Sequence, residues 1–463
     1  MNFKDVQEKF TKLQKQEDLE SASKISSIFS RSPTKIDLSN YFLFKKSRNV
    51  LLKQISQLSC QKNNLRHLIL QNCMLTSEIL SNLLKTLCKN KSQLLTLDLS
   101  NNRLTLEPVL GKLICRVFSG TSKGKSLILR GNNLTDSSFY RELYTKDVNF
   151  KELDLYDTGF TSECLITLSK ILSLNKNIST LNLGYNSEAF ENYVNVSTFA
   201  LSISENSYIQ YLVLSENESL SNSDSLIQLS EGLKKNQSLL SLDLAGISLQ
   251  DSGIILLANS LLQNCTFASL NISNNEIQDP GLEHFCRHFP GNLTSVDLSY
   301  NNFAYSNSVL ALGKLLKDTK SLRKLNISHS FELNDFSEDL ADLFCDCIMK
   351  NDSLAKFKCE GFKAPFDPDL ICDKLRGAIE VRKLSLTYKF SALNGTRIKS
   401  TEDSIVSNDF SVKMISKVPS SVWNYRDSAS QTEKKQYIES PNQEPIITTS
   451  KQITFLSSYD SAM

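Results

Sequence analysis

The stretch SLNISNNEIQDPGLEHF, Ser269 to Phe285, decides the fold because its opening phrase recurs along the chain, as in TLDLSNNRL at Thr96 to Leu104. Leu270 and Ile272 alternate with polar residues, which is the period of a short strand with one buried face. The second half of a unit changes rhythm: in QDSGIILLANSLLQNCTF, from Gln250, the apolar residues fall at helical spacing. Each unit therefore predicts a strand, a turn and a helix.

The unit returns about every 29 residues, and a single unit is too small to bury its own apolar face, so neighbouring units must stack. Clear copies are LRHLILQNCML from Leu65, LLTLDLSNNRL from Leu94, FKELDLYDTGF from Phe150 and LTSVDLSYNNF from Leu293. The second apolar residue of each copy gives the series Ile36, Leu68, Leu97, Leu127, Leu153, Leu181, Leu212, Leu242, Leu270, Val296, Leu325, Phe357 and Leu384.

The shared pattern L-x-x-L-x-L-x-x-N/C-x-L resembles the leucine-rich repeat, and the period with a helical second half resembles its ribonuclease-inhibitor-like class. The resemblance covers residues 33–388 and implies an α/β fold, a right-handed horseshoe solenoid of about 12 to 13 strand-helix repeats. It also implies a hydrogen-bonded ladder of asparagine amides after the strands, with Cys73 as a permitted substitute. The ladder positions are Asn102, Asn132, Asn186, Asn217, Asn275 and either Asn301 or Asn302; we expect interruptions at Thr158, Ile247, Ser330 and Phe362.

The two ends of the chain fall outside the repeat. Residues 1–32 place Phe3, Val6, Phe10 and Leu13 at helical spacing among charges, which predicts an amphipathic helix that caps the first repeat. Residues 389–463 are rich in Ser, Thr, Lys and Gln, which is typical of a disordered tail. Within this tail, SASQTE resembles the Q-T-centred motifs that dynein light chain binds by strand addition. A docking segment there would comprise Trp423, Ser430, Gln431 and Thr432.

Net charge, apolar runs and cysteine usage indicate which kind of partner and which cellular compartment to expect. The 463 residues carry 52 Lys+Arg against 50 Asp+Glu, a net charge of +2, so no overall field attracts nucleic acid or a lipid surface. No apolar run is long enough to span a membrane, and the N-terminus has no secretory h-region. The 11 cysteines are scattered, several at apolar repeat positions, which favours reduced thiols. We expect a soluble cytoplasmic protein, in the host cytoplasm if the chain is a bacterial effector.

The sequence offers no positive sign of an active site. His284 and His288 are one helical turn apart, but burial of their helix turns both outward and Cys286 inward, against a zinc site. Cys345 and Cys347 point to different sides of a helix. Phosphate-binding and nucleophile-elbow motifs are missing from the sequence. We expect a protein that is not an enzyme and needs no cofactor or metal.

The residues between and just after the strand leucines are displayed together on the concave face of such a solenoid. They are acidic and aromatic in its middle and basic toward Lys324, Lys356 and Lys358. Exposed tyrosines among carboxylates suit a protein partner, although Asp or Asn in these slots is also common in the family's consensus. The predicted contact residues are Glu152, Asp154, Tyr156, Asp157, Tyr185, Tyr211, Glu216, Asp243, Asp297 and Tyr300.

These observations favour an intracellular protein-protein interaction scaffold, expected to be a monomer, that binds a protein on its concave face. One alternative is a small-GTPase regulator resembling the Ran GTPase-activating protein, with Arg130 as its functional arginine. Others are a cytoskeletal or ciliary component, suggested by the dynein-light-chain-like segment, and a bacterial effector acting in a host cell.

Overall fold

A computed structural model places the repeats as one continuous stack. It describes residues 3–29, 34–58, 65–89, 93–105, 107–118, 124–144, 150–264, 266–332, 335, 337–363 and 377–378. The chain divides into two units, residues 1–398 and 399–463, and every described residue belongs to the first.

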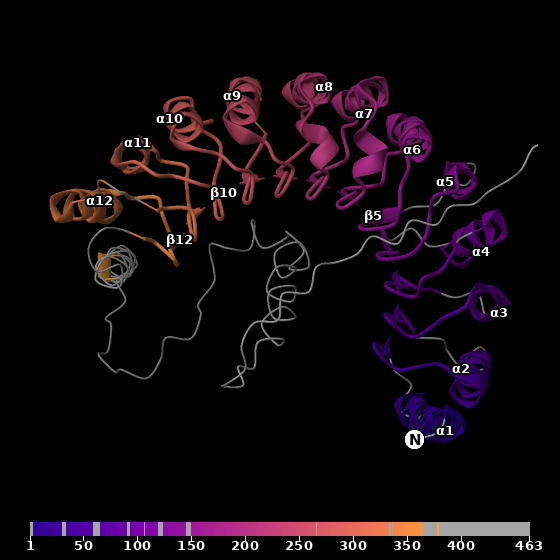
Figure 1. Cartoon of the computed structure of the whole chain (residues 1–463). Helices are drawn as coiled ribbons and strands as arrows, with labels where there is room; N and C mark the ends of the chain where they lie inside the picture. The colour runs from indigo at the N-terminus through magenta and orange to yellow at the C-terminus, as the bar shows by residue number, and fades with distance from the viewer. Residues whose placement is uncertain are drawn as a thin grey trace, which may run out of the picture. The chain divides into compact units, whose positions relative to one another are not determined.

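Twelve short strands form one parallel sheet in which each strand pairs with its neighbours in sequence. Figure 1 shows them along the inner side of the first unit. The strands are β1 Lys35–Asp37, β2 His67–Ile69, β3 Thr96–Asp98, β4 Lys125–Ile128, β5 Phe150–Asp154, β6 Thr180–Asn182, β7 Tyr211–Val213, β8 Ser241–Asp243, β9 Ser269–Asn271, β10 Ser295–Asp297, β11 Lys324–Asn326 and β12 Lys356–Lys358.

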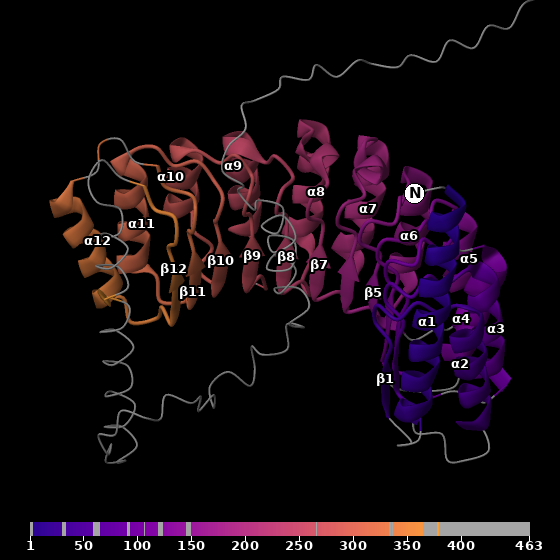
Figure 2. The ribbon, with the colours of Figure 1, turned by 60° about the horizontal axis from the view of Figure 1, so that its bottom comes forward.

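Helices form the outer layer, and the turned view of Figure 2 shows them side by side in a row next to the strands. Because a helix is wider than a strand, this layering curves the sheet with its free face inward. The helices are α1 Phe3–Phe29, α2 Lys45–Leu58, α3 Ser77–Lys89, α4 Pro108–Phe118, α5 Ser137–Tyr144, α6 Ser162–Leu174, α7 Tyr193–Glu205, α8 Ser223–Lys235, α9 Gln250–Leu261, α10 Asp279–Arg287, α11 Ser306–Asp318 and α12 Glu338–Lys350, with 3-10 turns at Ser187–Phe190 and Glu218–Ser221.

The predicted register is confirmed from β1 to β12. Ile36 pairs with Leu68, and the same pairing continues along the whole predicted series to Phe357. These side chains are buried between the sheet and the helices. Leu384, the last member of the predicted series, lies outside the described residues.

The asparagine ladder is present and less interrupted than the sequence suggests. Asn275 donates to the carbonyls of Leu244 and Ser273 and accepts from the amides of Ile247 and Leu249. At the ambiguous position, Asn301 takes the ladder role.

Two of the four expected interruptions are wrong, because a hydroxyl can also bond the turn. Thr158 Oγ1 donates to the Leu155 carbonyl at 2.8 Å. Ser330 Oγ donates to the Leu298 carbonyl at 2.7 Å and accepts from the Asn301 amide. Ile247 has no polar side-chain atom, so the ladder breaks there.

The predicted N-terminal helix is α1, and of the four residues predicted for its apolar side only the Leu13 side chain is described. Leu13 is exposed, whereas Ala22, Ile25 and Phe29 are buried. At 27 residues, or about 40 Å, α1 is much longer than the 14-residue α2 on which it packs, so α2 cannot cover all of it. Asp18 fixes the contact by accepting from the Lys46 and Ser47 amides. Its role as a cap stays a prediction.

Among the described residues, every helix falls short of the length and apolarity that a membrane crossing requires.

Candidate functional site

One backbone position in each repeat, immediately before the ladder position, adopts a left-handed conformation with φ between 52° and 66°. Glycine, asparagine and aspartate tolerate this region, whereas it is an outlier for a bulky residue. Tyr185 and Tyr300 therefore stand out, the more so because both are more than half exposed. In chain order the positions are Asn40, Asn72, Asn101, Gly131, Asp157, Tyr185, Glu216, Gly246, Asn274, Tyr300, His329 and Gly361.

A buried ion pair anchors the N-terminal side of the predicted contact region. Arg130 Nε donates to Asp154 Oδ2 at 2.7 Å, and the Asp154 residue is only 7% exposed. Desolvation raises the pKa of the Asp154 carboxyl, and the Arg130 charge opposes that shift. Asp154 therefore holds Arg130 in place and offers little surface to a partner.

Arg130 begins a stack of flat groups that crosses three repeats. Its guanidinium lies over the Tyr156 ring, 5.2 Å from the centroid, and Tyr156 stacks on Tyr185 with centroids 5.9 Å apart and 25° between the planes. Gly184 makes room, because a Cβ there would lie 2.8 Å from Tyr156 Cδ2. The stack leaves Tyr185 57% exposed.

We define the tyrosine rim as Tyr156, Asp157, Tyr185 and Glu216. All four follow the C-terminal ends of β5, β6 and β7. Backbone bonds from Asp157 N to the Gly184 carbonyl and from Tyr185 N to the Ser215 carbonyl hold successive turns side by side. Parallel strands are spaced by about 4.8 Å, so the turns that carry Asp157 and Glu216 lie on either side of Tyr185, and the Glu216 carboxylate lies close to Gly246 of the following repeat. Partial burial raises the pKa of Asp157.

Other predicted contact residues have structural partners. Glu152 Oε2 accepts from Ser126 Oγ at 2.7 Å, and Tyr211 is half-buried. Asp243 accepts from the Ala245 amide, and Asp297 accepts from the Ser299 amide and hydroxyl. These two aspartates close the turn after their strands, which explains their place in the repeated phrase.

A second aromatic stack lies further along the sheet. Tyr300, after β10, stacks on His329, after β11, with centroids 4.9 Å apart and 19° between the planes. His329 was missed by the sequence prediction, although alignment of the repeats puts it in the same left-handed slot as Tyr300.

The basic end of the sheet is confirmed at β11 and β12. Lys324 pairs in register with Lys356, and Lys358 follows on the same face; all three side chains are exposed. Their like charges repel.

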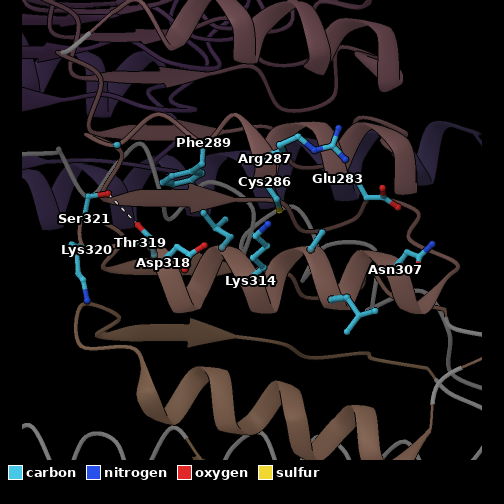
Figure 3. A pocket seen from close by; sticks show the side chains of 14 residues that line it. Glu283, Cys286, Arg287, Phe289, Asn307, Lys314, Asp318, Thr319, Lys320 and Ser321 are labelled. Carbon is cyan, nitrogen blue, oxygen red and sulfur yellow. Dashed lines mark hydrogen bonds between the residues drawn. The ribbon is translucent and has the colours of Figure 1, made fainter.

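A hollow of about 870 Å³ lies among the helices, between α10 and α11 (Figure 3). α10 ends at Arg287, after nine residues, whereas α11 has 13, and the lining of the hollow continues past the end of α10 to Phe289 and Gly291. The Pro290-Gly291 pair is a turn signal that could have indicated the end of α10 from the sequence. Its lining mixes apolar Phe289 and Leu310 with charged Arg287 and Lys314.

His284 of α10 and His288, the residue that follows this helix, both contact neighbouring groups. Their rings stack at 4.1 Å, His284 Nε2 contacts Asn259 Oδ1, and His288 Nδ1 contacts the His284 carbonyl. Both histidines and Cys286 are half-buried, so the expected split into outward and inward side chains is not sharp. Within the described ranges, no group of three or more His, Cys, Asp or Glu side chains could hold a metal ion.

The tail segment with Trp423, Ser430, Gln431 and Thr432 lies outside the described residues, so its predicted docking role stays a prediction.

A family model described as "Leucine Rich repeat" matches residues 263–286. A curated relative, the NACHT, LRR and PYD domains-containing protein 3 of Bos taurus, is 30% identical over 253 residues, which cover 48% of this chain. The match spans about a quarter (24%) of that protein's length.

Solved structures with related architecture are more distant. The leucine-rich repeat-containing protein LegL7 from Legionella pneumophila is 20% identical and covers 64% of this chain and 94% of its own, with a TM-score of 0.42. A chain of the Rad7 and Elc1 complex in yeast is 16% identical and covers 71% and 92%, with a TM-score of 0.38.

The confirmed repeat register, the ladder and the family match define the class: the chain is a leucine-rich repeat protein. This fold is in general a scaffold for protein interactions.

Proposed function

We propose that this protein is a non-enzymatic intracellular scaffold that binds a protein partner over the inner face of its sheet, with the tyrosine rim as the main contact. The observation that carries the proposal is the conformation of Tyr185 and Tyr300, which are exposed in slots where asparagine or glycine fits with less strain. Strained side chains kept at a surface are typical of functional sites. Exposed tyrosines are also typical of binding hot spots.

An intracellular location is supported by cysteine chemistry. The eight cysteines whose state the structure describes are all free thiols, most of them buried in the repeats. Free thiols of this kind suit a reducing compartment.

The geometry around Arg130 weighs against the small-GTPase alternative. An arginine that completes a nucleotide site must be free to reach it, whereas Arg130 is paired with Asp154 and covered by Tyr156. Its side chain is only 18% exposed.

The test is affinity capture from lysate, quantified by mass spectrometry, with the full chain and a Tyr185→Asn/Tyr300→Asn variant. We call it the rim variant; it changes Tyr185 of the tyrosine rim together with Tyr300, the other exposed tyrosine in a left-handed slot. Asparagine suits the left-handed slot, so strain relief of about 1 kcal/mol offsets the lost stacking of about 0.5–1.5 kcal/mol, and the variant should stay folded. The control is Tyr193→Ala, which removes a similarly exposed tyrosine from α7 in the helix layer.

We expect the rim variant to lose a specific protein by about 30-fold, the effect of one hot spot, and the control to retain it. Equal capture by the rim variant and the unmodified chain would contradict the proposal.

A further inference from the structure

We propose that the tyrosine rim is a receptor for an arginine side chain of the partner. The partner's guanidinium lies against the face of Tyr185 that is turned away from Tyr156 and pairs with the Glu216 carboxylate. This inference rests on the proposed protein-binding function and specifies the chemistry of its partner.

The chain already contains the arrangement once. Arg130 places its guanidinium over Tyr156 and its Nε on the Asp154 carboxylate. Two neighbouring repeats thus contain an arginine that both stacks on a tyrosine face and pairs with a carboxylate. Tyr185 continues the same stack. The residue that matches Asp154 in its repeat is the neutral Asn182, so an arginine from outside that stacks on Tyr185 would take its carboxylate from a neighbouring turn.

The repeats after Tyr156 leave space for such a side chain. Arg130 and Tyr156 occupy equivalent positions, three residues after the central strand leucine, and the next repeats place Gly184, Ser215 and Ala245 there. The Tyr156 ring already lies against Gly184, whereas the small side chains of Ser215 and Ala245 cannot fill the volume that Arg130 and Tyr156 fill. The region beside Tyr185 is therefore less crowded than the region beside Tyr156.

Arginine fits this place better than lysine does. A guanidinium is planar, stacks on an aromatic face and can bond a carboxylate through two N–H groups at once, whereas an ammonium is a compact, strongly hydrated charge. The carboxylates of Asp157 and Glu216, one repeat to each side, favour a cation over an anion at Tyr185.

The test uses fluorescence anisotropy of the full chain with three labelled hexapeptides, in which glycine alternates with arginine, lysine or glutamate. We expect the arginine peptide to bind most tightly. Tyr185→Asn should weaken it by about threefold to tenfold, the range of a partly exposed cation–π contact, and Glu216→Gln should weaken it and reduce its salt dependence.

Two variants distinguish stacking of the arginine on the Tyr185 ring from general contact with an apolar side chain at this position. Tyr185→Phe keeps the ring and should keep the affinity, whereas Tyr185→Leu keeps apolar bulk and should lose it. Tyr193→Ala should bind as the unmodified chain does. Equal binding of the arginine and glutamate peptides, or equal losses from Tyr185→Phe and Tyr185→Leu, would overturn the inference.

Failure of the arginine-receptor proposal can be distinguished from failure of the proposed scaffold function. If the rim variant loses its captured protein while Tyr185→Asn binds the arginine peptide normally, the scaffold proposal holds and the arginine receptor is wrong. If capture and peptide binding are both unchanged, both proposals fail.

Discussion

Asp154 illustrates how one carboxylate between two strand leucines becomes part of the protein interior. It lies at the end of β5, where the sequence pattern alone would place it on the open face of the sheet, yet Arg130 reaches over it from the preceding repeat. Its charge is tolerated because the guanidinium replaces water as its partner.

Removal of Arg130 should therefore destabilise the protein through Asp154. We expect Arg130→Ala to lower the free energy of unfolding in urea by about 3 kcal/mol, because a largely buried carboxylate loses its counter-charge. Arg130→Ala/Asp154→Asn should recover most of the loss. If the double variant is as unstable as the single one, the packing of Arg130 on Tyr156 matters more than the ion pair.

His284 gives a pH dependence with a defined sign. Desolvation, with the charges of His288 and Arg287, lowers its pKa in the folded state. The unfolded chain therefore takes up a proton more readily, so stability should fall as the pH drops below about 6.5, the unfolded value. In thermal unfolding between pH 7 and 5, His284→Gln should lose less stability than the unmodified chain. A steeper loss in the variant would contradict this assignment.

The sequence predicts where these side chains sit but not what they touch. Register follows from the leucine series, so Tyr185 and Tyr300 could be assigned to the inner edge of the sheet. The pairing of Arg130 with Asp154 depends on rotamers of residues 24 positions apart, which no repeat pattern encodes. Likewise, the pattern contains no signal that Thr158 and Ser330 use hydroxyls to continue the ladder.

At the scale of elements, the spacing between neighbouring helices decides whether a helical glycine can be replaced by alanine, and Gly232 and Gly313 differ in this respect. A Cβ on Gly232 in α8 would lie 2.5 Å from the Ala200 carbonyl oxygen of α7, which is backbone and cannot turn aside. A Cβ on Gly313 in α11 would lie 3.4 Å from Cys347 Sγ, an ordinary contact. Helix propensity alone would treat the two positions alike.

We therefore expect Gly232→Ala to destabilise the protein by about 1–3 kcal/mol through overpacking. Gly313→Ala should stabilise it by about 0.5–1 kcal/mol through helix propensity. Urea unfolding of the two variants, each compared with the unmodified chain, provides the measurement. A gain in stability for Gly232→Ala would mean that α7 and α8 can separate slightly without cost.

At the scale of the whole repeat unit, stability is transmitted only between neighbours, because each strand pairs with the next and each ladder asparagine bonds across one interface. Damage at one interface should therefore remain local. Asn275 is a suitable probe, since it is fully buried and joins the turns after β8 and β9.

Asn275→Ala should leave buried backbone groups of Leu244, Ile247 and Leu249 without their partner, at a cost of about 2–4 kcal/mol. Measured by hydrogen exchange with mass spectrometry, we expect faster exchange at residues 244–249 and 269–277 and no change at β2 to β4. Asn274→Gly is the matched control, because it alters the exposed neighbour in a left-handed slot that glycine suits and leaves the ladder intact. If Asn275→Ala accelerated exchange equally in every repeat, the unit would unfold as one cooperative body. The tyrosine rim would then share its stability with every repeat instead of with the few that surround it.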